Sequence, residues 1–219
     1  MIRVLLVDDH GLVRTGIRRL LEDHGRERGI EVVAEAASGE EALELSRQEP
    51  PDVVLMDVNM PGIGGLEATR RLLQHEPSIK VIALTVHARG PVPKRLLEVG
   101  ATGYLTKGCS VDEMITAIVR VARGERYLCA EIAEQLALSL IPSHGESPLD
   151  TLSYRELQIL LLITEGHKGQ AISQQLHLSP KTVSTYKRRL LEKLGVQSDA
   201  ELMRLAMKQG LVEDEQVGT

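Results

Sequence analysis

Residues 53–62 read Val-Val-Leu-Met-Asp-Val-Asn-Met-Pro-Gly, so that four apolar residues run directly into an aspartate and a Pro-Gly break follows. A short apolar run bounded by turn residues is typical of a strand buried on both faces of a parallel sheet. Asp57 then lies at the carboxyl end of this strand, the edge where open α/β sheets bind ligands. A carboxylate there is a metal ligand, a general acid or base, a nucleophile, or simply a cap for the next turn. Asp57 alone leaves these alternatives open.

The chain around this stretch alternates strand and helix patterns. The other predicted strands are residues 2–7, 31–36, 79–84 and 103–106. Helical spacing or capping signals mark residues 11–21, 39–45, 65–73, 93–99 and 110–123. Strands that alternate with helices predict an α/β fold, here a doubly wound, five-stranded parallel sheet of the flavodoxin-like kind.

Polar side chains follow four of these strands: Asp8 and Asp9, Asp57, Thr85, and Lys107. Right-handed crossovers place all these strand ends on one edge of the sheet. Three carboxylates brought together repel one another unless a cation neutralises them, and oxygen ligands favour a hard ion such as Mg²⁺. Because a lysine and a hydroxyl beside them favour an anion, the pattern predicts a phosphoryl group on a carboxylate with Mg²⁺ beside it.

The last third of the chain is organised differently. Residues 130–139 are weakly helical, and residues 141–148 have the composition of a linker. Four short helices are then predicted at residues 153–165, 171–176, 180–194 and 199–207. The tight turn at residues 177–178 predicts a helix-turn-helix motif in a small all-α domain.

The third of these helices has two distinct faces. Its inward side is predicted to consist of Val183, Leu190, Leu191 and Leu194. The candidate DNA contacts, on or beside the opposite side, are Lys181, Thr182, Ser184, Thr185, Tyr186, Lys187, Arg188, Arg189 and Lys193. Hydroxyls and arginine suit base edges in the major groove, and lysines suit phosphates. The alternative is a solvated basic face without a partner.

The segments at residues 7–10, 56–62, 84–85 and 104–107 resemble the receiver domain of bacterial two-component response regulators. The resemblance implies that Asp57 is the phosphoacceptor. It also implies that Asp9 binds Mg²⁺ directly, that Asp8 does so largely through water, and that the backbone carbonyl of Asn59 is a further ligand.

The same resemblance implies roles for three more residues. Lys107 pairs with the phosphoryl oxygens, Thr85 hydrogen-bonds one of them, and Tyr104 is the switch aromatic that turns inward when Thr85 moves. The sequence departs from many receivers at Gly108, where they have a proline. His87 is either an exposed loop histidine or, with Asn59, a residue that tunes the lifetime of the phosphoryl group.

Residues 152–205 resemble the LuxR/FixJ-type helix-turn-helix, with Glu156, Gly166, Thr182 and Gly195 at expected positions. A receiver followed by this motif is the NarL/FixJ class, and residues 7–16, 56–70 and 179–186 are especially similar to its GacA/UvrY branch. The implied domains are a receiver at 1–124, a helical or flexible linker at 125–147, the DNA-binding domain at 148–212 and an acidic tail at 213–219.

The resemblance also implies partners and activity. The partners are a sensor histidine kinase or a histidine phosphotransfer domain, double-stranded DNA, and a second copy of the chain that joins through residues 202–207 on phosphorylation. The protein would be a transcription regulator that phosphorylates itself and slowly dephosphorylates itself, and not a metabolic enzyme.

The bulk composition agrees with these expectations. The 219-residue chain carries a net charge of −5, so that any nucleic-acid surface must be local. No apolar run has membrane-spanning length, the start has no signal-peptide pattern, and the cysteines are Cys109 and Cys129 alone. A cytoplasmic location is expected.

Three rival functions share parts of this pattern. A phosphatase of the haloacid dehalogenase type needs a second aspartate two residues after Asp57, where this chain has Asn59. A degenerate receiver that serves only as an interaction module would not need the full set of polar strand ends. An output domain that binds a ligand or a protein in place of DNA remains the alternative.

Overall fold

The computed structural model describes residues 1–85, 91–139, 147–209 and 211. His87, residues 140–146 of the predicted linker and the tail at 213–219 lie outside the described residues. The chain divides into two compact units, one of residues 1–88 and 93–134, the other of residues 89–92 and 135–219. Each unit buries apolar side chains of its own.

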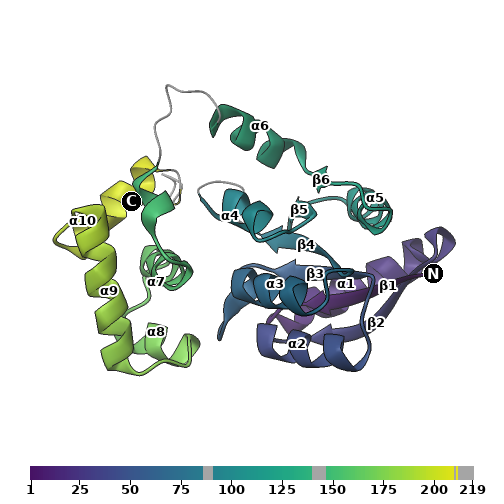
Figure 1. Ribbon diagram of the computed structural model, residues 1–219, viewed down its shortest axis with the longest axis horizontal. Helices are drawn as coiled ribbons and strands as arrows, with labels where there is room; N and C mark the ends of the chain where they lie inside the picture. Colours follow the sequence, from purple (N-terminus) through teal and green to yellow (C-terminus); the bar gives the residue numbers. More distant parts are fainter. Residues whose placement is uncertain (86–90, 140–146, 210, 212–219) are drawn as a thin grey trace. The chain divides into compact units, whose positions relative to one another are not determined.

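A parallel sheet of strand order β2-β1-β3-β4-β5-β6 forms the centre of the first unit (Figure 1). The strands are β1 (Ile2–Val7), β2 (Ile30–Ala36), β3 (Val53–Asp57), β4 (Lys80–Thr85), β5 (Gly103–Thr106) and β6 (Tyr127–Leu128). The first five confirm the predicted sheet, and the sixth extends it. The Tyr127 N–H donates to the carbonyl of Thr102 and the Cys129 N–H to that of Tyr104, each at 3.1 Å. Residues 127–128, which belong to none of the predicted strands, therefore add a short strand.

The helices of the first unit follow the predicted order. They are α1 (Gly11–His24), α2 (Gly39–Gln48), α3 (Gly64–His75), α4 (Val92–Glu98) and α5 (Val111–Ala122), with a 3₁₀ turn η1 (Arg26–Arg28) after α1 and α6 (Ala130–Ser139) after β6. The Ser38 and Ser110 hydroxyls accept hydrogen bonds from the N–H groups of Glu41 and Glu113, at 3.2 and 3.1 Å. Both predicted caps therefore begin helices.

Two apolar clusters cover the two faces of the sheet. Val4 and Leu6 of β1 join one cluster, which includes residues of α5, whereas Leu5 and Val7 join the other, which includes residues of α2 and α3. All residues of β3 are buried. Burial on both faces explains the uninterrupted apolar run and places Asp57 at the end of a rigid central strand.

The second unit contains the helical motif. Its elements are η2 (Pro148–Thr151), α7 (Tyr154–Thr164), α8 (Gly169–Gln175), α9 (Pro180–Leu194) and α10 (Asp199–Lys208). The hydroxyls of Ser153, Ser179 and Ser198 cap α7, α9 and α10. His177, with φ of 52°, makes the turn between α8 and α9. The small all-α domain is thus confirmed. None of the described helices has the length and apolar character that crossing a membrane requires.

Candidate functional site

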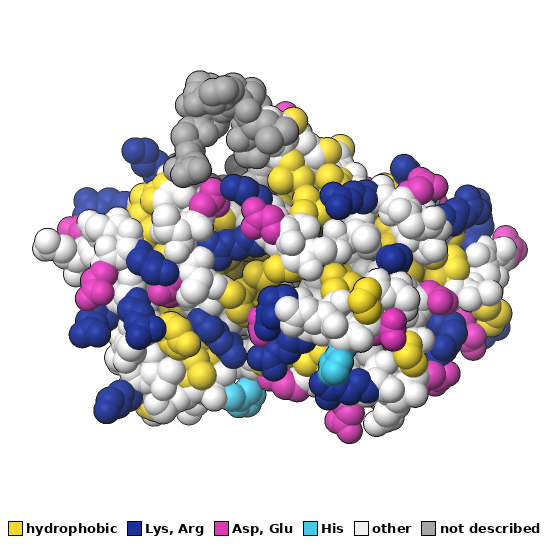
Figure 2. Space-filling view, viewed as in Figure 1, with side chains coloured by type: hydrophobic (Ala, Val, Ile, Leu, Met, Phe, Trp, Pro, Cys, Tyr) yellow, Lys and Arg dark blue, Asp and Glu magenta, His cyan; other side chains and the backbone are white. Residues whose placement is uncertain are grey.

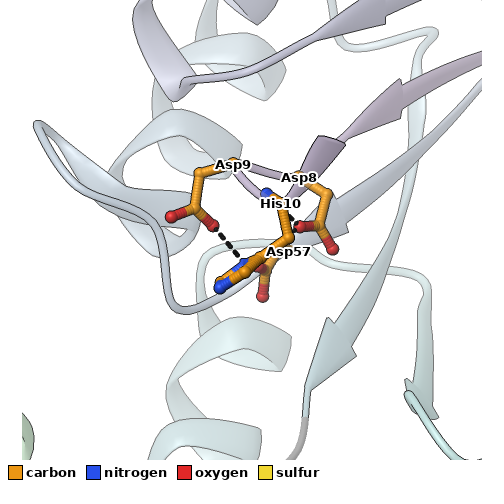
Figure 3. Close-up of side chains that lie close together, drawn as sticks. All are labelled: Asp8, Asp9, His10 and Asp57. Carbon is orange, nitrogen blue, oxygen red and sulfur yellow. Dashed lines mark hydrogen bonds and ion pairs between the residues drawn. The ribbon is translucent and has the colours of Figure 1, made fainter. Parts of the chain in front are cut away.

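The predicted acidic residues meet at the carboxyl edge of the sheet. Asp8 and Asp9 follow β1, and Asp57 ends β3. One ligand atom from each of these residues and from His10 lies within 4.8 Å of the others. Figure 3 shows the four side chains close together. Asp8 and Asp57 are 2% and 1% exposed. We call Asp8, Asp9, His10 and Asp57 the acidic cluster.

Lys107, which follows β5, joins two members of the acidic cluster. Its Nζ donates to Asp8 Oδ2 and to Asp57 Oδ2, both at 2.7 Å. Burial would lower the pKa of Lys107, but the hydrogen bonds to Asp57 and Asp8 outweigh burial and raise it. The lysine therefore keeps its charge beside the candidate phosphoacceptor.

The Asp57 carboxyl is buried beside Lys107, Asp8 and its own loop. Burial raises the pKa of its carboxyl, Lys107 opposes this shift, and the charge of Asp8 adds to it. The Asn59 N–H donates to Asp57 Oδ1 at 3.0 Å. A Cβ at Gly65 would lie 2.0 Å from the Asp57 carbonyl oxygen, so that only glycine lets α3 begin so close to this loop.

Thr85 and Tyr104 lie on the neighbouring strands β4 and β5. Both are buried, at 1% and 0% exposed, and their side chains are hydrogen-bonded to each other. Burial raises the pKa of the Tyr104 hydroxyl, which stays neutral. The ring expected to turn inward on switching therefore has an inward position in this structure.

The acidic cluster has an atom suited to a cation. Asp9 Oδ1 is buried and has no hydrogen bond of good geometry within the described residues. The nearby His10 Nδ1 lies 3.0 Å from it. Carboxylate oxygens with an unsatisfied member fit a divalent cation. Sequence reasoning missed His10, although its place directly after the acidic pair was a signal.

The polar face of α9 carries most of the predicted DNA contacts. Lys181, Ser184, Arg188 and Arg189 are exposed, and Thr182, Thr185, Tyr186 and Lys187 are half-buried. The Ser184 and Thr185 hydroxyls donate to carbonyls one turn earlier, each at 2.9 Å, and keep acceptor capacity. Figure 2 shows several dark blue lysine and arginine side chains on the visible face of this unit.

Two predicted DNA contacts are engaged within the unit. Lys193 Nζ lies 2.7 Å from Glu156 Oε2 of α7 and donates to the carbonyl of Thr151 at 3.2 Å. Lys187 Nζ lies 2.6 Å from Asp199 Oδ2 at the start of α10. Lys193 thus pairs with a buried carboxylate while its own side chain stays 40% exposed, and its contact with DNA stays a prediction.

Two family models match the chain. Residues 4–119 match the response regulator receiver domain, and residues 150–206 match the bacterial regulatory proteins of the luxR family. The two matches correspond to the sheet with its acidic cluster and to the helical motif with α9.

Individual relatives match along nearly the whole chain. Response regulator GacA of Pseudomonas aeruginosa is 55% identical over 214 residues, covering 97% of this chain and 99% of the relative. Response regulator UvrY of Escherichia coli K12 is 53% identical over 212 residues, covering 96% of each.

Solved structures of response regulators are also similar to this chain. A LuxR-family two-component response regulator from Aurantimonas sp. is 40% identical with a TM-score of 0.59, covering 63% of this chain and 96% of that one. The response regulator RcsB in a complex with DNA is 25% identical with a TM-score of 0.58, covering 94% of this chain and 98% of that one.

Proposed function

Because the chain belongs to the two-component response regulators, with a receiver domain followed by a LuxR-type DNA-binding domain, we propose that Asp57 accepts a phosphoryl group and thereby controls transcription. The donor is the phosphohistidine of a sensor histidine kinase or of a histidine phosphotransfer domain. The observation that carries the proposal is the 2.7 Å contact of Lys107 Nζ with Asp57 Oδ2 inside the acidic cluster. The contact places a fixed positive charge where phosphoryl oxygens would develop negative charge.

The transfer is a displacement at phosphorus. A carboxylate oxygen of Asp57 attacks, the bond from phosphorus to the histidine nitrogen breaks, and the leaving imidazole takes the electron pair and a proton from solvent. Asp8, Asp9, Asp57 and the carbonyl of Asn59 would hold Mg²⁺, which supplies charge neutralisation to the phosphoryl oxygens when bound. Lys107 stays charged and pairs with one of these oxygens.

Thr85 and Tyr104 would carry the signal away from Asp57. A phosphoryl group adds charge of about −1.5 to −2 and three acceptor oxygens. The Thr85 hydroxyl, now shared with Tyr104, would turn to one of these oxygens, and the ring of Tyr104 would be held inward by the rearranged strand ends.

The output is duplex DNA. The exposed polar face of α9 has the hydroxyls and arginines that read base edges, and Lys181 with Arg189 would contact phosphates. RcsB, a relative, has been solved in complex with DNA. Phosphorylation would favour a homodimer through α10 that presents two copies of α9 to two half-sites.

The proposed boundaries are those of the sequence analysis: a receiver at 1–124, a linker at 125–147, the DNA-binding domain at 148–212 and a tail at 213–219. A cytoplasmic location follows from a function on DNA and from a kinase donor.

The test is phosphorylation of the full chain by a small phosphodonor such as acetyl phosphate with Mg²⁺, compared with the Asp57→Ala variant. We expect acid-stable, hydroxylamine-labile label on the wild type and none on Asp57→Ala. Equal labelling of both would overturn the assignment of the phosphoacceptor. The Asp52→Ala variant, which changes an exposed carboxylate at the opposite end of β3, is the matched control and should label normally.

A further inference from the structure

His10 has a side chain that its own helix does not use. It is the N-cap residue of α1, yet its side chain makes no capping hydrogen bond. The imidazole is 65% exposed. Its position directly after Asp8 and Asp9 keeps the ring close to the carboxylates of Asp8, Asp9 and Asp57, as Figure 3 shows.

The spacing of the His10 ring matches that of a ligand. His10 Nδ1 lies 3.0 Å from Asp9 Oδ1 and 3.4 Å from Asp8 Oδ1. Two ligands of one small divalent ion, each about 2.1 Å from it and at right angles, are about 3 Å apart. A ligand oxygen of Asp57 also lies within 4.8 Å of the other three ligand atoms.

The backbone around His10 is firmly held. Its N–H donates to Asp8 Oδ1 at 2.8 Å, and its carbonyl accepts the Arg14 N–H at 3.0 Å. Arg14 Nη1 in turn donates to the carbonyl of Asp8 at 2.5 Å. The backbone of His10 therefore needs no rearrangement when the ring binds an ion.

We propose that His10 is a nitrogen ligand of the divalent-cation site and sets its metal preference. The inference rests on the proposed function, which gives the oxygen ligands to Asp8, Asp9 and Asp57. Imidazole favours ions such as Ni²⁺ and Zn²⁺, whereas carboxylates and water suit Mg²⁺. The ratio of the Ni²⁺ or Zn²⁺ affinity to the Mg²⁺ affinity is therefore higher with His10 than with the carboxylates alone.

The test is calorimetric titration of the full chain with Ni²⁺ and separately with Mg²⁺, at one fixed pH. His10→Ala should weaken Ni²⁺ binding by at least about tenfold and leave Mg²⁺ binding within about twofold. His24→Ala, which removes an exposed histidine from the other end of α1, is the matched control and should change neither. Asp9→Asn, which removes an oxygen ligand, should weaken both and identifies the binding event at this site.

A spectroscopic readout tests ligation directly. Pulsed EPR of bound Mn²⁺ should show coupling to a ¹⁴N nucleus in the wild type and in His24→Ala, and none in His10→Ala. An unchanged ratio of Ni²⁺ to Mg²⁺ affinity in His10→Ala, with no nitrogen coupling in the wild type, would overturn the role of His10 while leaving the oxygen site intact. Failure of the wild type to bind any of the three ions would overturn the proposed metal site as well.

Discussion

Gly65 is the single residue on which the approach of α3 to the phosphoacceptor loop depends. Its ideal Cβ would lie 2.0 Å from the Asp57 carbonyl oxygen and 2.8 Å from Val58 Cα, and both obstacles are backbone atoms. Gly65→Ala should therefore lower the free energy of unfolding by about 1–3 kcal/mol and slow the labelling of Asp57, because the loop must shift. Chemical denaturation and acetyl phosphate labelling measure the two effects.

The control is Gly108→Ala. A Cβ at Gly108 would meet no atom within 4 Å, so that this change should alter the stability by less than about 1 kcal/mol. Equal stability of the two variants would show that α3 can begin farther from the loop at no cost.

The residues of the acidic cluster also show what the sequence could predict. Because a parallel sheet must bring its strand ends to one edge, the sequence predicts one shared site for the polar residues that follow the strands. These residues are Asp8, Asp9, Asp57, Thr85 and Lys107. Their individual contacts were not predictable, since a strand pattern does not say that Lys107 Nζ would be shared between two carboxylates. The position of a side chain in a loop, such as that of His10, depends on rotamers that no periodicity encodes.

The element α9 illustrates the same limit. Helical periodicity correctly separated a polar face from an apolar face that buries Val183 and Leu190. It could not predict the ion pair of Lys193, because such a pair depends on a partner from another helix. Glu156 of α7 is that partner, at 2.7 Å and 3% exposed.

Breaking this pair should destabilise the second unit. Lys193→Met leaves the buried Glu156 carboxylate without its cation, which should lower the free energy of unfolding by about 1–2 kcal/mol. The value is below the roughly 3–5 kcal/mol typical of fully buried pairs, because the Lys193 side chain is 40% exposed. Lys181→Met, on the exposed face of α9, should leave stability unchanged and weaken DNA binding instead.

The effect of Lys193→Met should depend on pH. Burial alone would raise the pKa of Glu156, but hydrogen bonds from Lys193 and from Ser153 outweigh it and lower the pKa below its usual 4.5. The contribution of the pair is therefore fully present above pH 4.5 and is lost as the pH falls through the lowered value. A stability difference between wild type and Lys193→Met that stays constant down to pH 2 would contradict this assignment.

The short strand β6 was not predicted, for a different reason. Two residues, Tyr127 and Leu128, are too few to display an alternating pattern. Their pairing with β5 depends on the exit direction of α5, which is a tertiary property.

At the scale of the whole molecule, phosphorylation should change how many copies of α9 meet the DNA. The phosphorylated chain should bind its duplex about 5- to 150-fold more tightly, as couplings of 1–3 kcal/mol imply. If two protomers then bind together, the plot of log affinity against log salt concentration should be about twice as steep. Fluorescence anisotropy over a series of salt concentrations measures both.

The control for this measurement is the Asp57→Ala chain treated with the same phosphodonor. Its affinity and its salt dependence should not change. A wild-type affinity that rises while the salt dependence stays constant would mean that phosphorylation frees one DNA-binding domain without pairing two.

The ion pairs of Lys107 with Asp8 and Asp57 determine the net charge of the site. Three carboxylates and one ammonium give the site a net charge of −2, which a single dication balances. An acyl phosphate replaces the Asp57 carboxylate with a group of greater negative charge, so that the affinity of the site for its dication rises. By thermodynamic reciprocity, the bound dication should shift the equilibrium of phosphoryl transfer toward the acyl phosphate by the same factor.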